Sequence, residues 1–140
     1  MWEHNAPASE FPVTIAAQNG HYDIVQFLHE HGFPWGATTC GHAAMGGHFA
    51  ILKYARANGA PLDFRVCALS ARGGYFDILK WAHESGAPWD LYTCAEAARC
   101  GNLEMLQYCR AGGCHWDRLT CAAAAAQGHF EVLKWWGGAG

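Results

Sequence analysis

Residues 93–106 read TCAEAARCGNLEML, and a related stretch recurs along the chain at a constant spacing of 27 residues. The spacing is followed most strictly by the glycine of this stretch, which occurs as Gly20, Gly47, Gly74, Gly101 and Gly128. A fixed period of this size predicts that the chain stacks copies of one small structural unit. One repeat domain, 1–140, would then hold five units, at about 6–32, 33–59, 60–86, 87–113 and 114–140.

Each unit is expected to hold two helices joined by a tight turn. In the quoted stretch, Thr93 is predicted to cap the first helix, and Glu96 three residues later completes a capping-box pattern. Gly101 ends this helix, because a residue without Cβ readily takes a positive φ. The second helix begins at Leu103, and apolar residues such as Met105 follow at helical spacing. The sequence therefore predicts an all-α solenoid of about five stacked helix-turn-helix units.

Composition limits the classes of protein to which the chain can belong. Hydrophobic residues make up 51% of its 140 residues, which excludes a disordered chain and suits layered helices. Nine Lys and Arg against 12 Asp and Glu give no general attraction to nucleic acid. No apolar run approaches the roughly 20 residues of a membrane helix, and no signal-peptide pattern follows Met1. We therefore expect neither a nucleic-acid partner nor a membrane partner.

Four of the seven cysteines share one position in successive units, namely Cys40, Cys67, Cys94 and Cys121. Stacked helices lie about 10 Å apart, whereas a disulfide requires Cα atoms within about 7 Å of each other. Zinc requires four ligands around one ion, which residues one unit apart cannot supply. We predict that these cysteines are reduced and buried, which favours the cytoplasm or the nucleus.

The other residues that suggest chemistry have simpler structural interpretations. The position after the turn glycine holds His21, His48, Tyr75, Asn102 and His129, and we expect these side chains to hydrogen-bond the turn. The cluster His29-Glu30-His31 lacks the His-Glu-x-x-His spacing that places two imidazoles on one helical face. Tryptophans in the links are predicted to pack, and aspartates there to hydrogen-bond the turns; these are Trp35, Trp89, Trp116, Asp63, Asp90 and Asp117. We predict no catalytic residue, no metal ligand and no cofactor.

The segment 11–17, FPVTIAA, is similar to the Thr-Pro-Leu-His-x-Ala-Ala opening of ankyrin repeats. The order Thr…Ala-Ala-x-x-Gly-His-x-x-Ile-Leu…x-x-Gly-Ala extends this resemblance over the whole chain. Ankyrin units typically have 33 residues, and alignment on Gly86 and Gly101 places the missing six between Gly86 and Thr93. The family carries its β-hairpin finger there. The resemblance therefore implies an array without fingers, whose partner contacts lie on the first helices.

The resemblance also implies a protein-binding module with a groove lined by first helices. Exposed positions that vary between units are the candidates for recognition of a partner protein or peptide. They are Gln18, Asn19, His42, Met45, Phe64, Arg65, Leu69, Arg72, Leu91, Glu96, Arg99, Cys100, Arg118 and Gln127. Arg72 and Arg99 occupy successive units, with Arg65 and Arg118 nearby, so the groove is expected to prefer an acidic or mixed-charge segment. An ordinary solvated surface is the alternative interpretation of these arginines.

Two other functions fit the sequence. The chain could be a structural spacer within a longer array, because both ends fall inside the repeat pattern and the last helix lacks a polar outer face. That helix would carry Trp135 and Trp136 and be weakened by Gly137 and Gly138, which predicts self-association through the ends. The third function, an enzyme or metal protein that uses the histidines and cysteines, is the least favoured.

Overall fold

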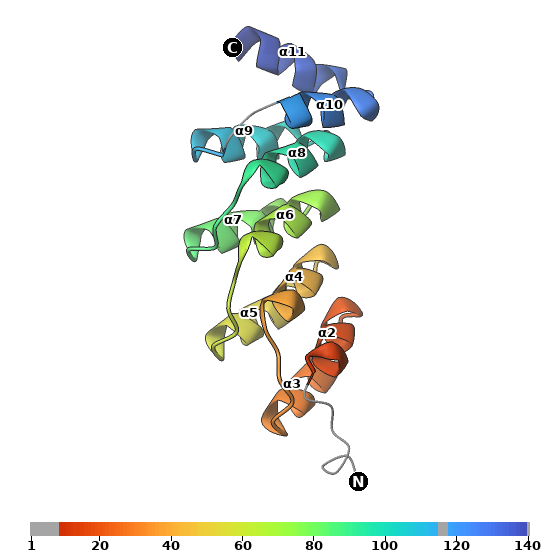
Figure 1. Cartoon of the computed structure of the whole chain (residues 1–140), viewed down its shortest axis with the longest axis vertical. Helices are drawn as coiled ribbons and strands as arrows, with labels where there is room; N and C mark the ends of the chain where they lie inside the picture. The colour runs from red at the N-terminus through yellow and green to blue at the C-terminus, as the bar shows by residue number, and fades with distance from the viewer. Residues whose placement is uncertain (1–8, 115–117, 140) are drawn as a thin grey trace.

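The computed structural model describes residues 9–114 and 118–139, and within them it contains α-helices and no strand. Figure 1 shows these helices stacked along one axis, with the two termini at opposite ends. First helices alternate with second helices along the chain. In order, they are α2 (Phe11–Gln18), α3 (Tyr22–Glu30), α4 (Ala37–Met45), α5 (Phe49–Ala57), α6 (Phe64–Gly73), α7 (Phe76–Glu84), α8 (Leu91–Cys100), α9 (Leu103–Ala111), α10 (Arg118–Ala126) and α11 (Phe130–Ala139).

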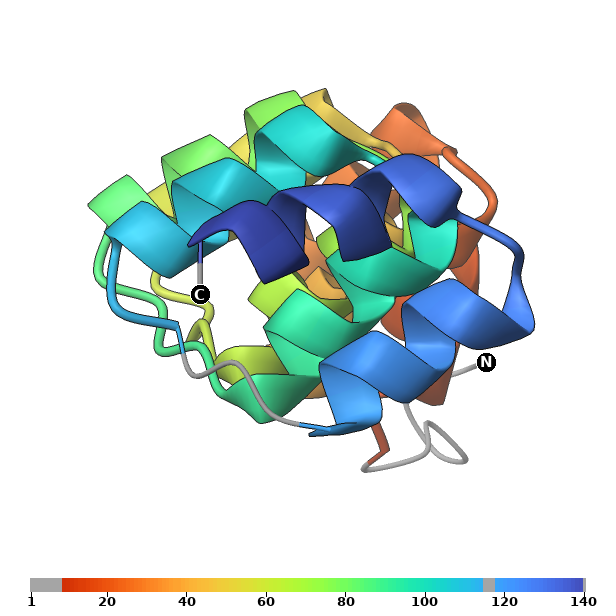
Figure 2. The ribbon, with the colours of Figure 1, turned by 90° about the horizontal axis from the view of Figure 1, so that it is seen from above.

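The helices form two layers, which are visible when the stack is viewed from its end (Figure 2). The first helices α2, α4, α6, α8 and α10 pack directly on one another, whereas successive second helices contact each other much less. Small buried side chains such as Ala44, Ala71 and Ala98 allow this close approach of the first helices. Each first helix and the second helix that follows it form one helix pair. The predicted all-α solenoid of helix-turn-helix units is confirmed.

The first helices begin earlier than the sequence analysis predicted. Helix α8 begins at Leu91, and the Asp90 carboxylate accepts a hydrogen bond from the Tyr92 N–H at 3.0 Å. The predicted cap, Thr93, therefore lies inside the helix, and its capping box with Glu96 was wrong. Asp63 caps α6 in the same way, through the Arg65 N–H at 2.9 Å. Asp63 and Asp90 are thus helix caps, a role for which Asp is preferred over Thr.

The turn between the two helices of a pair depends on glycine, as predicted. Gly47 has φ +77°, and a Cβ added there would lie 2.5 Å from Cζ of Tyr75 in the next helix pair. The side chain of His48, one residue further on, contacts the preceding helix pair instead of the next one. Its Nε2 lies 3.1 Å from the carbonyl oxygen of Gln18 in the preceding helix pair. The residues after the turn glycines were expected to bond their own turn, but His48 links neighbouring pairs instead.

The carbonyl oxygens equivalent to that of Gln18 in two later helix pairs are contacted by other side chains. His129 Nε2 lies 2.8 Å from the carbonyl oxygen of Arg99. Asn102 does not make this contact, because its side chain accepts from the Met105 N–H at 3.0 Å and caps α9. The thiol of Cys100 donates to the carbonyl oxygen of Arg72 instead, at 3.0 Å. The contacts of His48, His129, Asn102 and Cys100 are therefore structural.

The cysteine column lies in the core. Cys40, Cys67 and Cys94 are fully buried, and Cys121 is half-buried. Burial raises the pKa of the Cys40 thiol to about 11 and that of Cys67 to about 12. All seven cysteines are free thiols. The predicted burial is confirmed for the first three members of the column.

Aromatic residues pack in the links between helix pairs. Trp35 stacks on His29 with ring centroids 3.9 Å apart, and Trp89 stacks on His83 at 3.8 Å. This confirms the packing role predicted for these two tryptophans. Trp116 and Asp117 lie outside the described residues.

Candidate partner-binding surface

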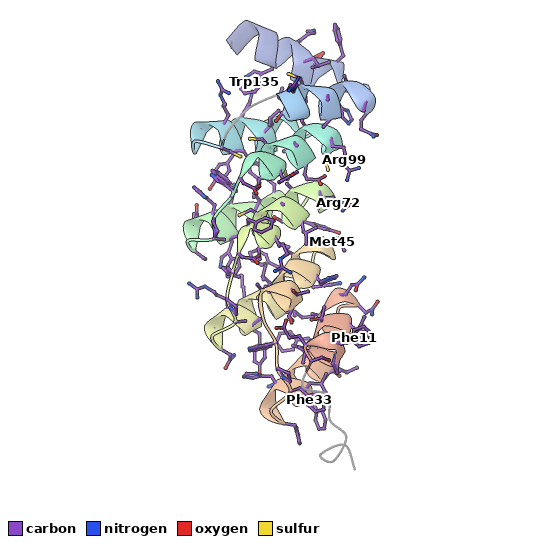
Figure 3. The ribbon with its side chains drawn as sticks, viewed as in Figure 1. Phe11, Phe33, Met45, Arg72, Arg99 and Trp135 are labelled. Carbon is purple, nitrogen blue, oxygen red and sulfur yellow. The ribbon has the colours of Figure 1, made fainter. Side chains whose placement is uncertain are left out.

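The C-terminal ends of the first helices carry one side chain each at the same position, and we call this set the helix-end row. Its members are Gln18, Met45, Arg72, Arg99 and Ala126. Figure 3 shows three of them, Met45, Arg72 and Arg99, along one edge of the stack. Because the members come from successive helices that pack directly on each other, they form a continuous strip. An extended segment of a partner could contact several of them at once.

Two of the predicted arginines are paired with carboxylates of their own unit. Arg99 Nε lies 2.9 Å from Glu96 Oε1. Arg65 Nε lies 3.1 Å from Asp63 Oδ2, and its Nη1 donates to Thr38 Oγ1 at 2.6 Å. Arg72 is exposed, and none of the described carboxylates forms an ion pair with it. The positive charge of the helix-end row is therefore concentrated at Arg72.

A hollow of about 530 Å³ lies at the Gln18 end of the helix-end row, between α2 and α4. Its lining includes Gln18 and His42, two residues that the sequence analysis selected. Phe11, which is 68% exposed, and Ile15, which is 39% exposed, add apolar surface. His42 Nδ1 is buried and has no hydrogen-bond partner among the described residues. The other lining residues are Ser9, Glu10, Thr14 and Thr38.

Sequence reasoning did not select Phe11 as a site residue, although it belongs to this hollow. Its equivalents in the next two units, Thr38 and Arg65, are polar. An apolar residue in this polar column was the signal that could have identified Phe11 as a site residue. Phe11 was interpreted only as part of the repeat opening. Its exposure became evident only from the positions of the neighbouring helices.

The predicted residues do not all lie together. Phe64, Arg65 and Arg118 lie at the N-terminal ends of first helices, opposite the helix-end row. A helix of nine residues separates its two ends by roughly 12 Å, because each residue advances 1.5 Å. His42, Leu69 and Glu96 lie between the two edges. One narrow partner segment would therefore contact only part of the predicted set.

The remaining predicted residues surround the turns or lie outside the description. Asn19 is exposed, and its side-chain amide donates to the Ile15 carbonyl oxygen at 2.9 Å. Cys100 is exposed but donates its thiol to the carbonyl oxygens of Ala71 and Arg72. Gln127 is exposed directly after α10. The side chain of Leu91 is not among those that the structure describes.

The histidine cluster of the sequence analysis takes part in packing. The His29 ring stacks on Trp35, and His31 Nδ1 lies 2.8 Å from the Phe27 carbonyl oxygen. Across residues 9–114 and 118–139, no group of three or more His, Cys, Asp or Glu side chains could hold a metal ion. In the same residues, no helix has the length and apolar character needed to cross a membrane.

Comparison with known proteins agrees with this geometry. A family profile described as "Ankyrin repeats (many copies)" matches residues 13–56. Among solved structures, the ankyrin repeat domain of human ASB11 aligns with a TM-score of 0.72 and 20% sequence identity. Residues 13–56 are therefore similar to ankyrin repeats, and the chain has the fold of an ankyrin repeat domain. The structural alignment covers 88% of this chain and 66% of that domain, so the chain spans slightly less than two thirds of its length.

At 20% identity, the likeness to the ASB11 domain is one of fold. No curated protein sequence matches the chain. Ankyrin repeats are generally modules for protein–protein interaction, and their fold is typically a scaffold without enzymatic activity. The described links between helix pairs in this chain contain no strand.

Proposed function

We propose that the chain is a protein-interaction module that binds a segment of another protein along the helix-end row. The observation that carries this proposal is the continuous strip formed by Gln18, Met45, Arg72 and Arg99 on successive packed helices. The hollow beside Gln18 supports it, because it offers exposed apolar surface and the unpaired Nδ1 of His42. Such a combination suits an apolar side chain flanked by polar groups.

The preferred segment is acidic or of mixed charge. Arg72 is the exposed cation of the row that has no described carboxylate partner, and a carboxylate on the segment would supply one. Arg99 is held by Glu96, but this ion pair is partly exposed at the surface, where such pairs contribute only about 0–1 kcal/mol. A partner carboxylate can therefore compete for Arg99 at little cost. Because salt screens the attraction between these arginines and the carboxylates of the segment, the affinity should fall as the salt concentration rises.

The test is affinity capture with the parent chain and with a double variant, Arg72→Glu and Arg99→Glu, followed by mass spectrometry. Proteins bound through the row are captured by the parent and lost from the double variant, while thermal unfolding stays the same. Arg110→Glu is the matched control, because Arg110 is an exposed arginine on the second helix α9. Capture that is equal for the parent, the double variant and the control would contradict the proposal.

A second candidate function is a structural segment of an array of repeat units. It is favoured by exposed aromatic side chains in the two end helix pairs, Phe27 at 52% and Phe130 at 66%. In this role the end pairs contact other repeat units, and the isolated chain self-associates. Size measurement at several concentrations tests it, and a chain that stays monomeric throughout would exclude it.

We also propose that the chain works in the cytoplasm or the nucleus. Seven free thiols, three of them fully buried in one column, suit a compartment that keeps cysteine reduced. Imaging of the tagged protein in intact cells tests this location. Recovery in an oxidising compartment would contradict it.

A further inference from the structure

A second hollow, of about 390 Å³, lies in the middle of the stack between the turns that lead into α5 and α7. We call it the turn hollow. Described helix pairs stand on both sides of it along the stack (Figure 1), so its walls do not depend on either end of the chain. The lining residues are Gly47, Phe49, Gly74, Tyr75, Phe76, Asp77 and Ile78.

Three aromatic rings form the apolar part of the turn hollow. Phe49 and Phe76 are half-buried, and Tyr75 is 38% exposed. The Tyr75 ring rests on the backbone of both turns. A Cβ added to Gly47 would lie 2.5 Å from Cζ of this ring, and a Cβ added to Gly73 would lie 2.6 Å from its Cε2. The ring is therefore held in place by the glycines beneath it.

Asp77 adds a negative charge to these rings. It is exposed in the first turn of α7, and none of the described side chains forms an ion pair with it. At the equivalent position, Glu131 pairs with Lys134 three residues later, at 3.2 Å. Lys80 also lies three residues after Asp77, but its Nζ lies over the Phe76 ring, 4.7 Å from the centroid. No described cation therefore neutralises the Asp77 carboxylate.

The combination of rings and charge belongs to this one place in the repeat pattern. At the preceding contact between second helices, Ala50 replaces the aspartate. At the following contact, Asn102 and Leu103 replace the tyrosine and the second phenylalanine, although Glu104 keeps the carboxylate. The repeat does not require the combination for its own packing, because other residues fill the equivalent positions.

Rings beside an unpaired carboxylate favour a cation, since the face of an aromatic ring attracts positive charge. The chain already shows this preference for lysine. Lys53 Nζ lies 4.3 Å from the centroid of Phe49, and Lys80 makes the same contact with Phe76. Neither lysine lines the turn hollow, so the ring surface inside it is not covered by their ammonium groups. The N-terminal end of α7 alone would attract an anion, but the charge of Asp77 opposes one there.

The turn hollow adjoins the helix-end row. Gly47 and Gly74 follow Met45 and Arg72 by two residues each, which places the Cα atoms of each pair within roughly 7 Å. We infer that the turn hollow binds the ammonium group of a lysine on the partner segment, while a carboxylate of the same segment meets Arg72. The inference rests on the proposed function and specifies the segment as one of mixed charge.

An NMR titration with Nα-acetyl-lysine methylamide tests the lysine site without any partner protein. The amide signals of residues 75–78 should shift and saturate with this probe. The norleucine analogue, which has the same stem without the ammonium group, and the glutamate analogue should not produce these shifts. Asp77→Ala should bind the lysine probe about fivefold more weakly, because it removes one surface ion pair.

Glu104→Ala is the matched control, because Glu104 is an exposed carboxylate at the same helix position in the next unit. It should bind the lysine probe like the parent. Unfolding curves verify that both variants are folded, and Ala50 shows that the fold accepts alanine at this position. Equal affinity of the lysine and norleucine probes, equal affinity of the parent and Asp77→Ala, or tighter binding of the glutamate probe would each overturn the inference.

Affinity capture then tests whether the partner segment supplies the lysine. Proteins lost from the Arg72→Glu, Arg99→Glu variant should also be lost from Asp77→Ala and retained by Glu104→Ala. Capture that depends on the arginines but not on Asp77 would overturn the inference and leave the proposed function standing. Capture that the arginine variant does not change would contradict the proposed function, whereas the titration decides the lysine site by itself.

Discussion

The imidazole ring of His83 lies parallel to the indole ring of Trp89, with 3.8 Å between the centroids and 10° between the planes. Tyr108 of the next helix pair meets the edges of both rings, at centroid distances of 6.0 Å. This cluster closes the link that leads from α7 to α8 and joins it to the second helix of the next pair. An offset or edge-to-face aromatic contact contributes about 0.5–1.5 kcal/mol beyond its buried area.

Replacement of Trp89 by leucine is expected to lower the free energy of unfolding by about 1 kcal/mol, because it removes the stacked partner of His83. Leucine is a fair substitute, since Leu62 occupies this position in the preceding unit. Urea unfolding measures the loss. A double-mutant cycle with His83→Ala isolates the ring contact, and a coupling energy near zero would show that the stack contributes nothing.

Gly47→Ala is expected to destabilise the chain more than Gly74→Ala. Both glycines have similar positive φ values, +77° and +80°, so alanine costs about 1–2 kcal/mol at either position. Only at Gly47 does the added Cβ collide with Tyr75, which adds about 1–3 kcal/mol for overpacking. Thermal or urea unfolding compares the two variants. In a Tyr75→Ala background the difference should disappear, and a difference that persists would exclude the collision as its cause.

Thr93→Val is expected to be neutral or stabilising, although the sequence analysis took Thr93 for a helix cap. Its hydroxyl is buried without a hydrogen-bond partner among the described residues, and valine removes this unsatisfied group at nearly constant shape. Val66 already fills the equivalent position. By contrast, Asp90→Ala removes the true cap of α8 and should cost about 1 kcal/mol. Unfolding curves of the two variants distinguish the roles, and the reverse order of stability would restore Thr93 as the cap.

The buried thiols predict a loss of stability at alkaline pH. The pKa of Cys67 rises from its ordinary value of 9.0 to about 12 on folding, because burial disfavours the thiolate. The folded chain therefore holds this proton more tightly than the unfolded chain. The stability from the buried neutral thiol is complete below pH 9.0 and is lost as the pH rises toward 12.

Urea unfolding as a function of pH measures this effect. Cys67→Ala should flatten the decline of the unfolding free energy above pH 9.0, by up to about 1.4 kcal/mol for each pH unit. Cys100→Ala is the control, because Cys100 is the exposed last residue of α8 and its removal should change the slope less. Equal slopes for the parent and Cys67→Ala would contradict the assignment.

The fold could be predicted from the sequence because its strongest signals are periodic. Gly101 ends α8 with φ +76° and Leu103 begins α9, as their columns indicated. The start of α8 could not be fixed in the same way, since Asp90 and Thr93 are both good caps and only the position of the helix decides between them. Local pairs such as Glu96 with Arg99 lay within reach of sequence reasoning, because residues three apart meet on a helix.

The contacts that join the units could not be predicted. His48 bonds the carbonyl oxygen of Gln18, 30 residues earlier in the chain, and no local pattern specifies this partner. The exposure of Phe11 likewise depends on which helices stand beside α2, and this follows from packing. The sequence therefore indicated the layer of helices that carries the candidate site, but not the division of its residues between two edges.

The aromatic cluster at His83 and Trp89 recurs at His29 and Trp35, two units earlier, and the intervening unit has Arg56 and Leu62 instead. In both clusters the histidine belongs to a second helix and the tryptophan to the link that follows it. An exchange of repeat units between two such arrays would therefore keep the cluster only if the link is transferred together with the helix that precedes it.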